Sequence, residues 1–447
     1  MKILTRRDML KALGMATLAT AYPFSLGCAK PDDDDENGKV PGGNGNNGTG
    51  YLVGKVLPDW EEGYLDIHTI NTGRGESTLY IFPDGTTMLV DAAGSLMNDM
   101  LANGDEDADD GVPPTPPKPS ISVTSGQAIT NYVNYFAKAA SNKLNYILLT
   151  HFHGDHMGTY AATLPMAPSA DFRMNGITEV GAKVKFDKIL DRGYPNYNFP
   201  TNLAATAMVG NYIKFVNWSK AAYGATAEQF DVGKTDQIVL KQNPSKYNNF
   251  QIRNIVGNGK VWTGTGVEVT NMLPDASVIN AATYKNENIF SIGFQLKYGR
   301  FNYFAGADLQ YTNRSLYPWL DVEKPVADVV TAVDVMKANH HCTSNCNSDV
   351  LVEKLNPKVV LVHAWREKHP YPATTKRFYD KSTDIFSTCV MDANKVLLNN
   401  YTSRIRSMQG HIVVRVSPSA LQYTVYVLDD SNEEYKIKGI FGPYQCN

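Results

Sequence analysis

The sequence predicts a layered α/β domain, and three observations support this fold class. Short apolar runs typical of strands recur along the chain, with helix candidates between them. Hydrophobic residues make up 43% of the 447 residues and charged residues 19%, a balance typical of chains that bury a core. No apolar run reaches the roughly 18 residues that a membrane-spanning helix needs. We therefore expect a globular protein with one large α/β domain and insertions, and not an integral membrane protein.

Residues 1–27 are predicted to be an export signal. Arg6 and Arg7 precede a short apolar stretch, residues 12–24, and together they resemble a twin-arginine signal. An ordinary Sec leader with a basic start fits the same residues. Cys28 resembles the lipidated cysteine of a lipobox, the alternative being a secreted protein with a chance cysteine. We expect an exported protein, lipid-anchored to the outer membrane or the cell surface, with a periplasmic location as the alternative and no other membrane contact.

Residues 28–50 are predicted to be a flexible tether. They contain an acidic run, residues 32–36, followed by a stretch rich in Gly and Asn. Like charges repel one another and glycines offer no side chains to pack, so this segment contributes no core. An acidic run after a lipidated cysteine also resembles the export tag of some surface lipoproteins. The folded domain is then residues 51–447.

The expected elements of this domain follow from the apolar runs in chain order. Strands are expected at residues 64–71, 77–82, 86–91, 144–150, 290–297, 301–306, 358–363, 411–416 and 423–428. Helices are expected at residues 125–141, 349–355 and 374–379. Two insertions interrupt this alternation. Residues 98–123 are acidic and then Pro-rich, which predicts an extended surface loop, and the aromatic-rich residues 160–285 are interpreted as an elaboration that carries much of the substrate surface.

The segment from His151 to His156, with the sequence HFHGDH, carries most of the chemical information. It follows the apolar strand expected at residues 144–150. At a strand exit, His151 and His153 project to the same side and can share one ion, while the turn at Gly154 directs Asp155 and His156 toward a second ion. Imidazole and carboxylate are ligands for zinc, iron or manganese. The alternative, a polar loop that is rich in histidine by chance, leaves these groups without partners.

An HxHxDH motif at a strand exit resembles the metallo-β-lactamase superfamily. Four further segments resemble its subfamily of the DNA-internalisation competence protein ComEC: residues 66–94 with Thr-Gly-Arg-Gly-Glu-Ser, residues 287–308, residues 334–357 and His369-Pro370. The resemblance implies an αββα sandwich with an inserted, aromatic-rich elaboration. It also implies two divalent metal ions, zinc or manganese, as cofactors.

The resemblance also implies roles for single residues. Asp308 would bridge the two ions, which His151, His153, Asp155 and His156 would bind on either side. Of the pair His340 and His341, one would be a metal ligand and the other would contact the substrate phosphate or orient a ligand; we favour His341 as the ligand. Asp91 would position the histidine loop. The residues assigned to catalysis are Asp155, His340 and His369.

The sequence departs from the wider superfamily in two respects. The third histidine of the first metal site is missing, because no histidine lies between His156 and the pair at 340–341. Asn288 or Ser291 are candidates for that place, and a neutral oxygen ligand favours manganese over zinc. The second departure is Cys342-Thr343, where the subfamily has Gly-Ser. Cys342, Cys346, Cys389 and Cys446 are available for two disulfides or remain free.

The sequence therefore predicts an extracytoplasmic metal-dependent hydrolase in which two ions share a hydroxide. The resemblance indicates a phosphodiester substrate, with nucleic acid as one candidate. Aromatic residues between 194 and 262, with Lys214, Lys220 and Lys260, are candidates for contacts with a single strand, and ordinary packing is the alternative. A formal net charge of −3 argues against a broad surface for duplex nucleic acid.

Two alternatives to a phosphodiesterase stay open. One is a hydrolase of another ester (a phosphocholine or glycerophosphate diester, a lactone or a β-lactam), and the other is a non-catalytic surface-binding lipoprotein with a degraded metal site. No protein partner is inferred.

Overall fold

The computed structural model describes residues 52–96, 114–141, 143–274, 287–312 and 318–447. All of them belong to one compact unit, Thr49–Asn447. The predicted leader and tether, Cys28 and most of the acidic loop lie outside the described residues. The domain boundary at residue 51 therefore stays a prediction.

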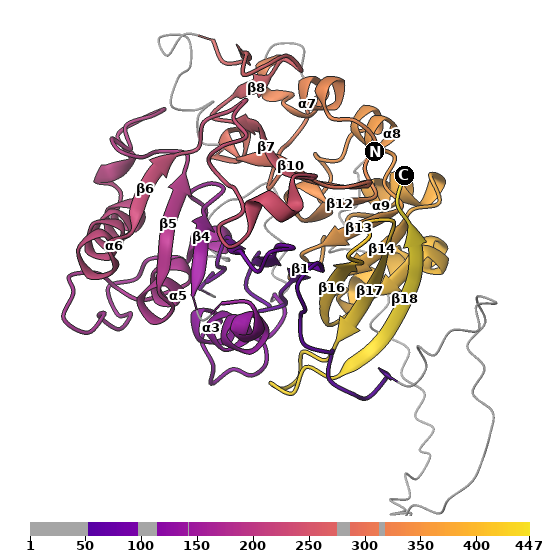
Figure 1. The fold of residues 1–447 in the computed structure, drawn as a ribbon, viewed down its shortest axis with the longest axis horizontal. Helices are drawn as coiled ribbons and strands as arrows, with labels where there is room; N and C mark the ends of the chain where they lie inside the picture. Colours follow the sequence, from indigo (N-terminus) through magenta and orange to yellow (C-terminus); the bar gives the residue numbers. More distant parts are fainter. Residues whose placement is uncertain (1–51, 97–113, 142, 275–286, 313–317) are drawn as a thin grey trace, which may run out of the picture. The chain divides into compact units, whose positions relative to one another are not determined.

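Two mixed sheets form the centre of this unit (Figure 1). The first consists of β1 (Leu65–Thr69), β2 (Thr78–Ile81), β3 (Thr87–Val90), β4 (Leu144–Leu148), β5 (Phe186–Asp191), β6 (Thr226–Gln229), β16 (His411–Val416), β17 (Gln422–Leu428) and β18 (Ile437–Gln445). The second consists of β7 (Phe250–Gly257), β8 (Lys260–Trp262), β9 (Val269–Asn271), β10 (Gly293–Tyr298), β11 (Phe301–Ala305), β12 (Val335–Lys337), β13 (Val359–Val362), β14 (Asp384–Ser387) and β15 (Ile405–Ser407). Their strand orders are β18-β17-β16-β1-β2-β3-β4-β5-β6 and β15-β14-β13-β12-β11-β10-β7-β8-β9.

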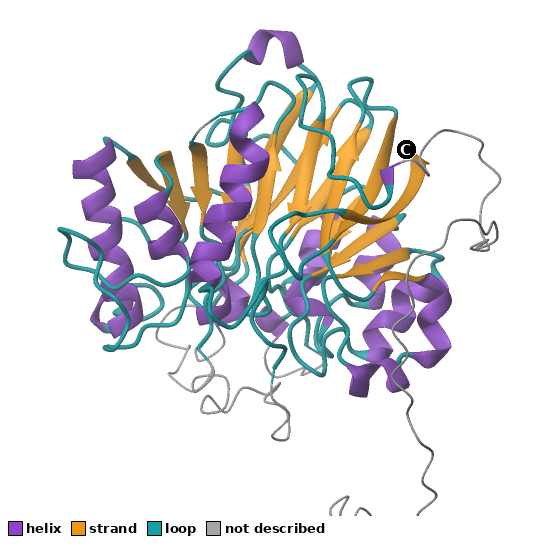
Figure 2. Ribbon diagram, turned by 90° about the horizontal axis from the view of Figure 1, so that it is seen from below, coloured by secondary structure: helices purple, strands orange, loops and turns teal. Residues whose placement is uncertain are grey.

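Helices lie along the outer flanks of the two sheets (Figure 2). They are α3 (Ser125–Phe136), α4 (Gly154–Met157), α5 (Ile177–Lys183), α6 (Ala207–Tyr223), α7 (Glu323–Val329), α8 (Asp349–Leu355), α9 (Pro372–Asp380) and α10 (Asp392–Leu397). Short 3₁₀ turns occupy Ala137–Ala139, Leu203–Ala205, Pro244–Tyr247, Glu287–Phe290, Pro318–Leu320, Asn339–Cys342 and Asn399–Arg404. Among the described helices, none combines the length and the apolar character needed to cross a membrane.

Three apolar clusters fill the spaces between these layers. Residues of β1 to β4 pack against residues of β10 to β13 in a cluster between the two sheets. A second cluster joins the first sheet to α3, α5 and α6, and a third joins the second sheet to α7, α8 and α9. Strand side chains alternate between the faces, so Val359 and Leu361 enter the inner cluster whereas Val360 and Val362 contact the helices. The expected α/β fold class, a two-sheet sandwich between helical layers, is confirmed.

The elements expected from the sequence are present, with ends that shift by a few residues. The sequence did not predict β5 to β9, all of which lie within residues 160–285 and extend one edge of each sheet. β5 escaped detection because Asp187 and Lys188 interrupt its apolar run at half-buried positions. Within the predicted surface loop, Thr115 is buried and its N–H donates to the carbonyl oxygen of Trp365 (3.0 Å), so this part of the loop packs against the domain.

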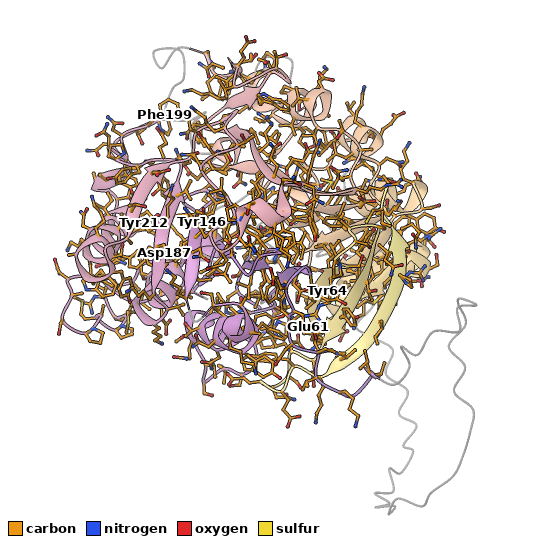
Figure 3. The ribbon with its side chains drawn as sticks, in the orientation of Figure 1. Glu61, Tyr64, Tyr146, Asp187, Phe199 and Tyr212 are labelled. Atoms are coloured by element: carbon orange, nitrogen blue, oxygen red, sulfur yellow. The ribbon has the colours of Figure 1, made fainter. Side chains whose placement is uncertain are left out.

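The aromatic residues between 194 and 262 are mostly packing residues. Tyr212 and Phe215 of α6 are fully buried against the first sheet, and Tyr197 is 3% exposed. Figure 3 labels Tyr212 on this helix and Phe199, which is 36% exposed. The structure therefore favours ordinary packing for Tyr197, Tyr212 and Phe215, and leaves Phe199 as an accessible ring.

A buried ion pair in the first sheet has a predictable effect on stability. Asp66 of β1 lies directly opposite Arg415 of β16, and Nη2 of Arg415 is 2.6 Å from Oδ2 of Asp66. Replacing Arg415 with Met should lower the free energy of unfolding by about 3 kcal/mol, because the carboxylate of Asp66 stays buried without its partner. Chemical denaturation at pH 7 measures this change. The control is Lys138→Met, which removes an exposed pair with Asp59 and should change the stability little.

The same pair predicts a pH dependence of the stability. Burial opposes ionisation of Asp66, but Arg415 and His68 outweigh it and lower its pKa to about 2. A lowered folded-state pKa stabilises the fold at pH above about 4, the ordinary value, and this contribution is lost as the pH falls toward 2. The difference in stability between wild type and Arg415→Met should therefore shrink on acidification. A difference that stays constant down to pH 2 would contradict this account of the pair.

Candidate metal centre

The predicted ligands come from loops at the same end of both sheets. The HFHGDH loop leaves the end of β4, Asp308 follows β11, and His341 lies in the turn Asn339–Cys342 after β12. β11 and β12 are neighbouring parallel strands, so their carboxyl ends meet at one edge of the second sheet. The hydrogen bond from the N–H of Ile292 to the oxygen of Thr150 (3.1 Å) joins this edge to the exit of β4.

The carboxylates of Asp308 and Asp155 lie among three imidazoles. Oδ2 of Asp308 is 3.1 Å from Nε2 of His156, 3.3 Å from Nε2 of His341 and 3.9 Å from Nε2 of His151. Oδ2 of Asp155 is 3.0 Å from Nε2 of His341 and 3.7 Å from Nε2 of His156. These oxygens and nitrogens lie close enough to one another to bind the same cation.

His153 joins the cluster through His151. Nδ1 of His153 is 3.2 Å from Nε2 of His151, and this Nε2 is in turn 3.9 Å from Oδ2 of Asp308. Burial and the neighbouring imidazoles lower the pKa of His151 well below its usual value, so this ring is neutral. A neutral imidazole is the form that binds a metal ion.

Asp91 fixes the orientation of the histidine loop. Its Oδ1 accepts the N–H of Thr150 (2.8 Å), while Oδ2 accepts the hydroxyl of Thr150 (2.7 Å) and the Nδ1–H of His156 (2.7 Å). The contact at Nδ1 fixes the ring so that Nε2 of His156 is directed at Asp308 and is the nitrogen left for a metal ion. Asp91 has a left-handed backbone with φ of 57°, which Asp tolerates better than most residues. Its position matches the role that the sequence resemblance implies.

The two adjacent histidines point to different surroundings. His341 faces Asp155 and Asp308, whereas Nε2 of His340 is 3.1 Å from Nδ2 of Asn288 and its Nδ1 is 3.0 Å from the hydroxyl of Thr343. His341 is therefore the one of the pair that the structure brings into the cluster. His340, His341 and Cys342 all have positive φ, and Cys342 (φ 62°) adopts the backbone that the Gly of the subfamily motif would adopt without strain.

His369 lies beside the cluster rather than within it. Its ring stacks on that of His341 with centroids 4.9 Å apart and planes at 23°. Trp365 packs edge-on against both rings. Nδ1 of His369 and Nε1 of Trp365 are buried and have no hydrogen-bond partner among the described residues. Two ring nitrogens next to His341 are thus available for a hydrogen bond with a ligand. The sequence had suggested His369 but not Trp365.

Ser291 and Asn288, the residues suggested in place of the missing third histidine, support other residues of the site. Ser291 accepts the backbone N–H of Asp308 through Oγ (3.3 Å), and Asn288 contacts His340. Their observed roles are to hold Asp308 and His340. His363 is buried, and its Nε2 lies 3.1 Å from the oxygen of Ser77.

Glu76 and Lys337 also belong to this centre, and the sequence did not assign a role to either. Glu76, His156, Asp308 and His341 offer ligand atoms that all lie within 4.8 Å of one another. Nζ of Lys337 is 2.7 Å from Oε2 of Glu76. The available signals were the acidic residue of the Thr-Gly-Arg-Gly-Glu-Ser segment and the lysine shortly before the paired histidines.

The donor set fits a metal ion in its chemistry and its charge. Burial raises the pKa of Asp155 and Asp308, but the imidazoles of His156 and His341 outweigh it and hold both pKa values well below the usual range. Glu76 is likewise ionised, since Lys337 lowers its pKa despite burial. Burial lowers the pKa of His156 and His341, but Asp308 and Asp155 outweigh it, so that the pKa of His341 rises to about 9 and that of His156 rises well above its usual value. Without an ion the carboxylates therefore pair with Lys337 and with two protonated imidazoles, and a divalent cation can take the place of the two imidazole protons.

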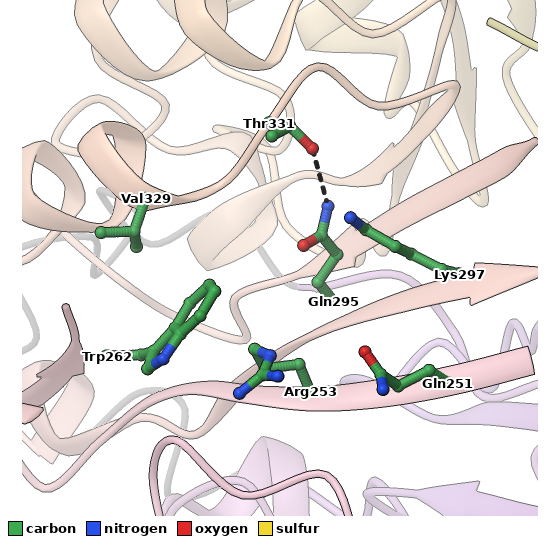
Figure 4. A pocket seen from close by; sticks show the side chains of 7 residues that line it. All are labelled: Gln251, Arg253, Trp262, Gln295, Lys297, Val329 and Thr331. Carbon is green, nitrogen blue, oxygen red and sulfur yellow. Dashed lines mark hydrogen bonds between the residues drawn. The ribbon is translucent and has the colours of Figure 1, made fainter. Parts of the chain in front are cut away.

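The remaining features of the chain lie apart from this centre. The four described cysteines are free, so no disulfide joins them. A separate polar pocket on the second sheet is lined by Gln251, Arg253, Trp262, Gln295, Lys297, Val329 and Thr331 (Figure 4). It contains none of the predicted site residues.

Comparison with known proteins gives structural similarities only. No family model matches the chain, and no curated protein matches it. A putative metal-dependent hydrolase from Parabacteroides distasonis is 13% identical, with a TM-score of 0.34 over 72% of this chain and 92% of that one. The metallo-β-lactamase fold protein YhfI from Bacillus subtilis is 12% identical (TM-score 0.34; 72% and 96%), and zinc-bound PqqB from Methylobacterium extorquens is 10% identical (TM-score 0.33; 72% and 97%). The chain is a mixed α/β sandwich with a candidate metal-binding cluster, on the evidence of its own sheets, helices and side chains.

Proposed function

We propose that the chain is an exported, metal-dependent phosphodiesterase with two divalent ions at the candidate metal centre. The observation that carries the proposal is the convergence of six ligand-type side chains from loops of both sheets, with their imidazole nitrogens and carboxylate oxygens facing one another. These side chains are His151, His153, Asp155, His156, Asp308 and His341.

Each side chain has a distinct place in this proposal. His151 and His153 offer nitrogens for one ion, whereas Asp155, His156 and His341 offer ligand atoms for the other. Oδ2 of Asp308 lies within 3.9 Å of nitrogens from both sets, which suits a shared ligand. Divalent ions held there would lower the pKa of a coordinated water and stabilise charge that develops on the ester oxygens.

The surroundings of His341 support an anionic ester as the substrate. His369 and Trp365 present ring nitrogens next to the centre, namely Nδ1 and Nε1, and neither atom has a hydrogen-bond partner among the described residues. Ring N–H groups at such a place can hydrogen-bond a charged phosphate oxygen or the leaving oxygen of a diester. The resemblance of the sequence to the ComEC-like subfamily supports the same substrate class. In this proposal His369 is the residue that would contact the substrate directly.

Metal analysis followed by an activity assay tests this function. The purified protein should contain divalent metal and should hydrolyse bis-p-nitrophenyl phosphate when manganese is added, with the activity lost on chelation and restored by the ion. Turnover of a lactone or a β-lactam without turnover of the phosphodiester would reassign the substrate. A metal-loaded protein that hydrolyses none of these esters would identify a binding protein instead.

The proposed location rests on Cys28 as a lipid anchor. Replacing Cys28 with Ser should release the protein from membranes into the soluble fraction, because the acyl chains that hold it there would have no attachment point. The control is Cys389→Ser, which alters a partly buried cysteine of the folded domain and should leave the fractionation unchanged. Fractionation after a high-salt wash measures both variants. A Cys28→Ser protein that stays with the membranes is not anchored at this residue.

A further inference from the structure

A lysine lies buried behind the candidate metal centre. Lys337 is the last residue of β12, which lies between the parallel strands β11 and β13, and only 1% of it is exposed. The preceding residues of β12 alternate between the inner apolar cluster and the helical face. Lysine is seldom buried to this degree unless its charge is paired, so its position calls for a partner and a reason.

The ammonium of Lys337 joins the two sheets. Nζ is 2.7 Å from Oε2 of Glu76, which precedes β2 in the first sheet, and 3.5 Å from Oδ1 of Asp308 in the second. It also donates a hydrogen bond to the carbonyl oxygen of Ala307 (2.6 Å). Oδ1 of Asp308 therefore faces the ammonium, while Oδ2 faces the imidazoles of His156 and His341.

We infer that Lys337 is a positioning residue that orients Asp308 for its role as the shared metal ligand, with Glu76 as the counter-ion of the lysine and not a ligand. This inference rests on the proposed function. The contact with Oδ1 fixes the rotation of the Asp308 carboxylate, so that one oxygen is presented to the cluster. The hydrogen bond to Ala307 holds the backbone next to Asp308 in the same way.

The position of the ammonium also decides the role of Glu76. Lys337 lies between Glu76 and Asp308 and already supplies a positive charge there, so a divalent ion in the same gap would be repelled. Oε2 of Glu76 is 3.8 Å from Nδ1 of both His341 and His363, and hence lies behind the imidazole whose Nε2 faces the cluster. Glu76 thus completes the geometric group of candidate ligands without facing the side at which an ion would bind.

A set of variants separates positioning from simple charge burial. Lys337→Met alone leaves Glu76 unpaired and risks unfolding, so the informative variant is the double substitution Lys337→Met with Glu76→Gln, which removes both charges. The matched control is Lys358→Met, which removes a lysine paired with Asp334 (3.3 Å) at the opposite end of these strands. Glu76→Gln alone tests the counter-ion. The readouts are calorimetric titration of the metal-free proteins with manganese and the visible absorption of cobalt(II), which depends on ligand geometry.

The double variant should bind manganese about 10- to 100-fold more weakly than the wild type and show an altered cobalt(II) spectrum. Lys358→Met and Glu76→Gln should keep the wild-type stoichiometry and spectrum. Unchanged or tighter binding by the double variant would overturn the positioning role, and loss of an ion in Glu76→Gln would make Glu76 a ligand. Both results leave the proposed function standing, whereas a wild-type protein that binds no divalent ion contradicts the proposed function and this inference together.

Discussion

Replacing Asp308 with Asn should reduce the metal content of the protein from about two ions per chain to one or none, and hydrolysis should fall by orders of magnitude. The substitution keeps the shape of the side chain and removes the charge that lies within 3.9 Å of three imidazole nitrogens. Elemental analysis of the dialysed protein and the rate with bis-p-nitrophenyl phosphate measure the two effects. The fold should survive, because the apolar clusters hold the sheets independently of the ions.

The matched control for this substitution is Asp334→Asn. Asp334 is also a buried carboxylate beside a lysine of the second sheet, but it precedes β12 and accepts the N–H of Asn302 (3.0 Å) far from the histidines. We expect a lower melting temperature and the full metal content. If Asp308→Asn keeps both ions and full activity, Asp308 is not the shared ligand.

Replacing Asp91 with Asn should weaken metal binding about 10- to 100-fold. Because Asn has the same size as Asp, the substitution leaves no cavity in the core. The amide oxygen of Asn can still accept the N–H of Thr150, but its NH₂ group would then face the Nδ1–H of His156, donor against donor. His156 would be driven to carry its proton on Nε2, the atom that faces Asp308. An imidazole nitrogen that carries a proton cannot bind a metal ion.

Asp191→Asn is the control that isolates this tautomer effect. Asp191 ends β5 in the same sheet and accepts hydroxyl groups of Tyr197 and Tyr212, and among the described residues no histidine is hydrogen-bonded to it. Calorimetric titration with manganese should show wild-type affinity for Asp191→Asn together with lower thermal stability. Equal metal affinity in Asp91→Asn and the wild type would show that Asp91 does not act through His156.

The sequence was most informative where the fold depends on local patterns. Apolar runs such as residues 411–416 and 358–363 marked strands that the structure contains, because strands covered on both faces need continuous apolar side chains. Strands with mixed composition were missed. β12 has only three residues and ends in Lys337, and in β5 the half-buried Asp187 and Lys188 interrupt the apolar run, so neither shows a period that a single sequence reveals.

In the candidate site, too, the sequence predicted some residues and missed others. The ligand-type residues of the HFHGDH loop are adjacent in sequence, and the structure brings them together with Asp308 and His341 from far along the chain. The orientation of His341 rather than His340 depends on a turn with three consecutive positive φ angles, which residue types alone do not specify. Glu76 and Lys337 were missed for another reason: a buried ion pair between two sheets becomes visible only when both sheets are in place.

The central claim is that two divalent ions occupy this centre and share Asp308. Anomalous diffraction from crystals equilibrated with manganese tests it most directly, since the map locates each ion among the side chains. The account predicts two peaks about 3.5–4 Å apart, one beside His151 and His153 and one beside Asp155, His156 and His341. A map without peaks at these side chains, or with a single peak between Glu76 and Asp308 in place of the Lys337 ammonium, would contradict it.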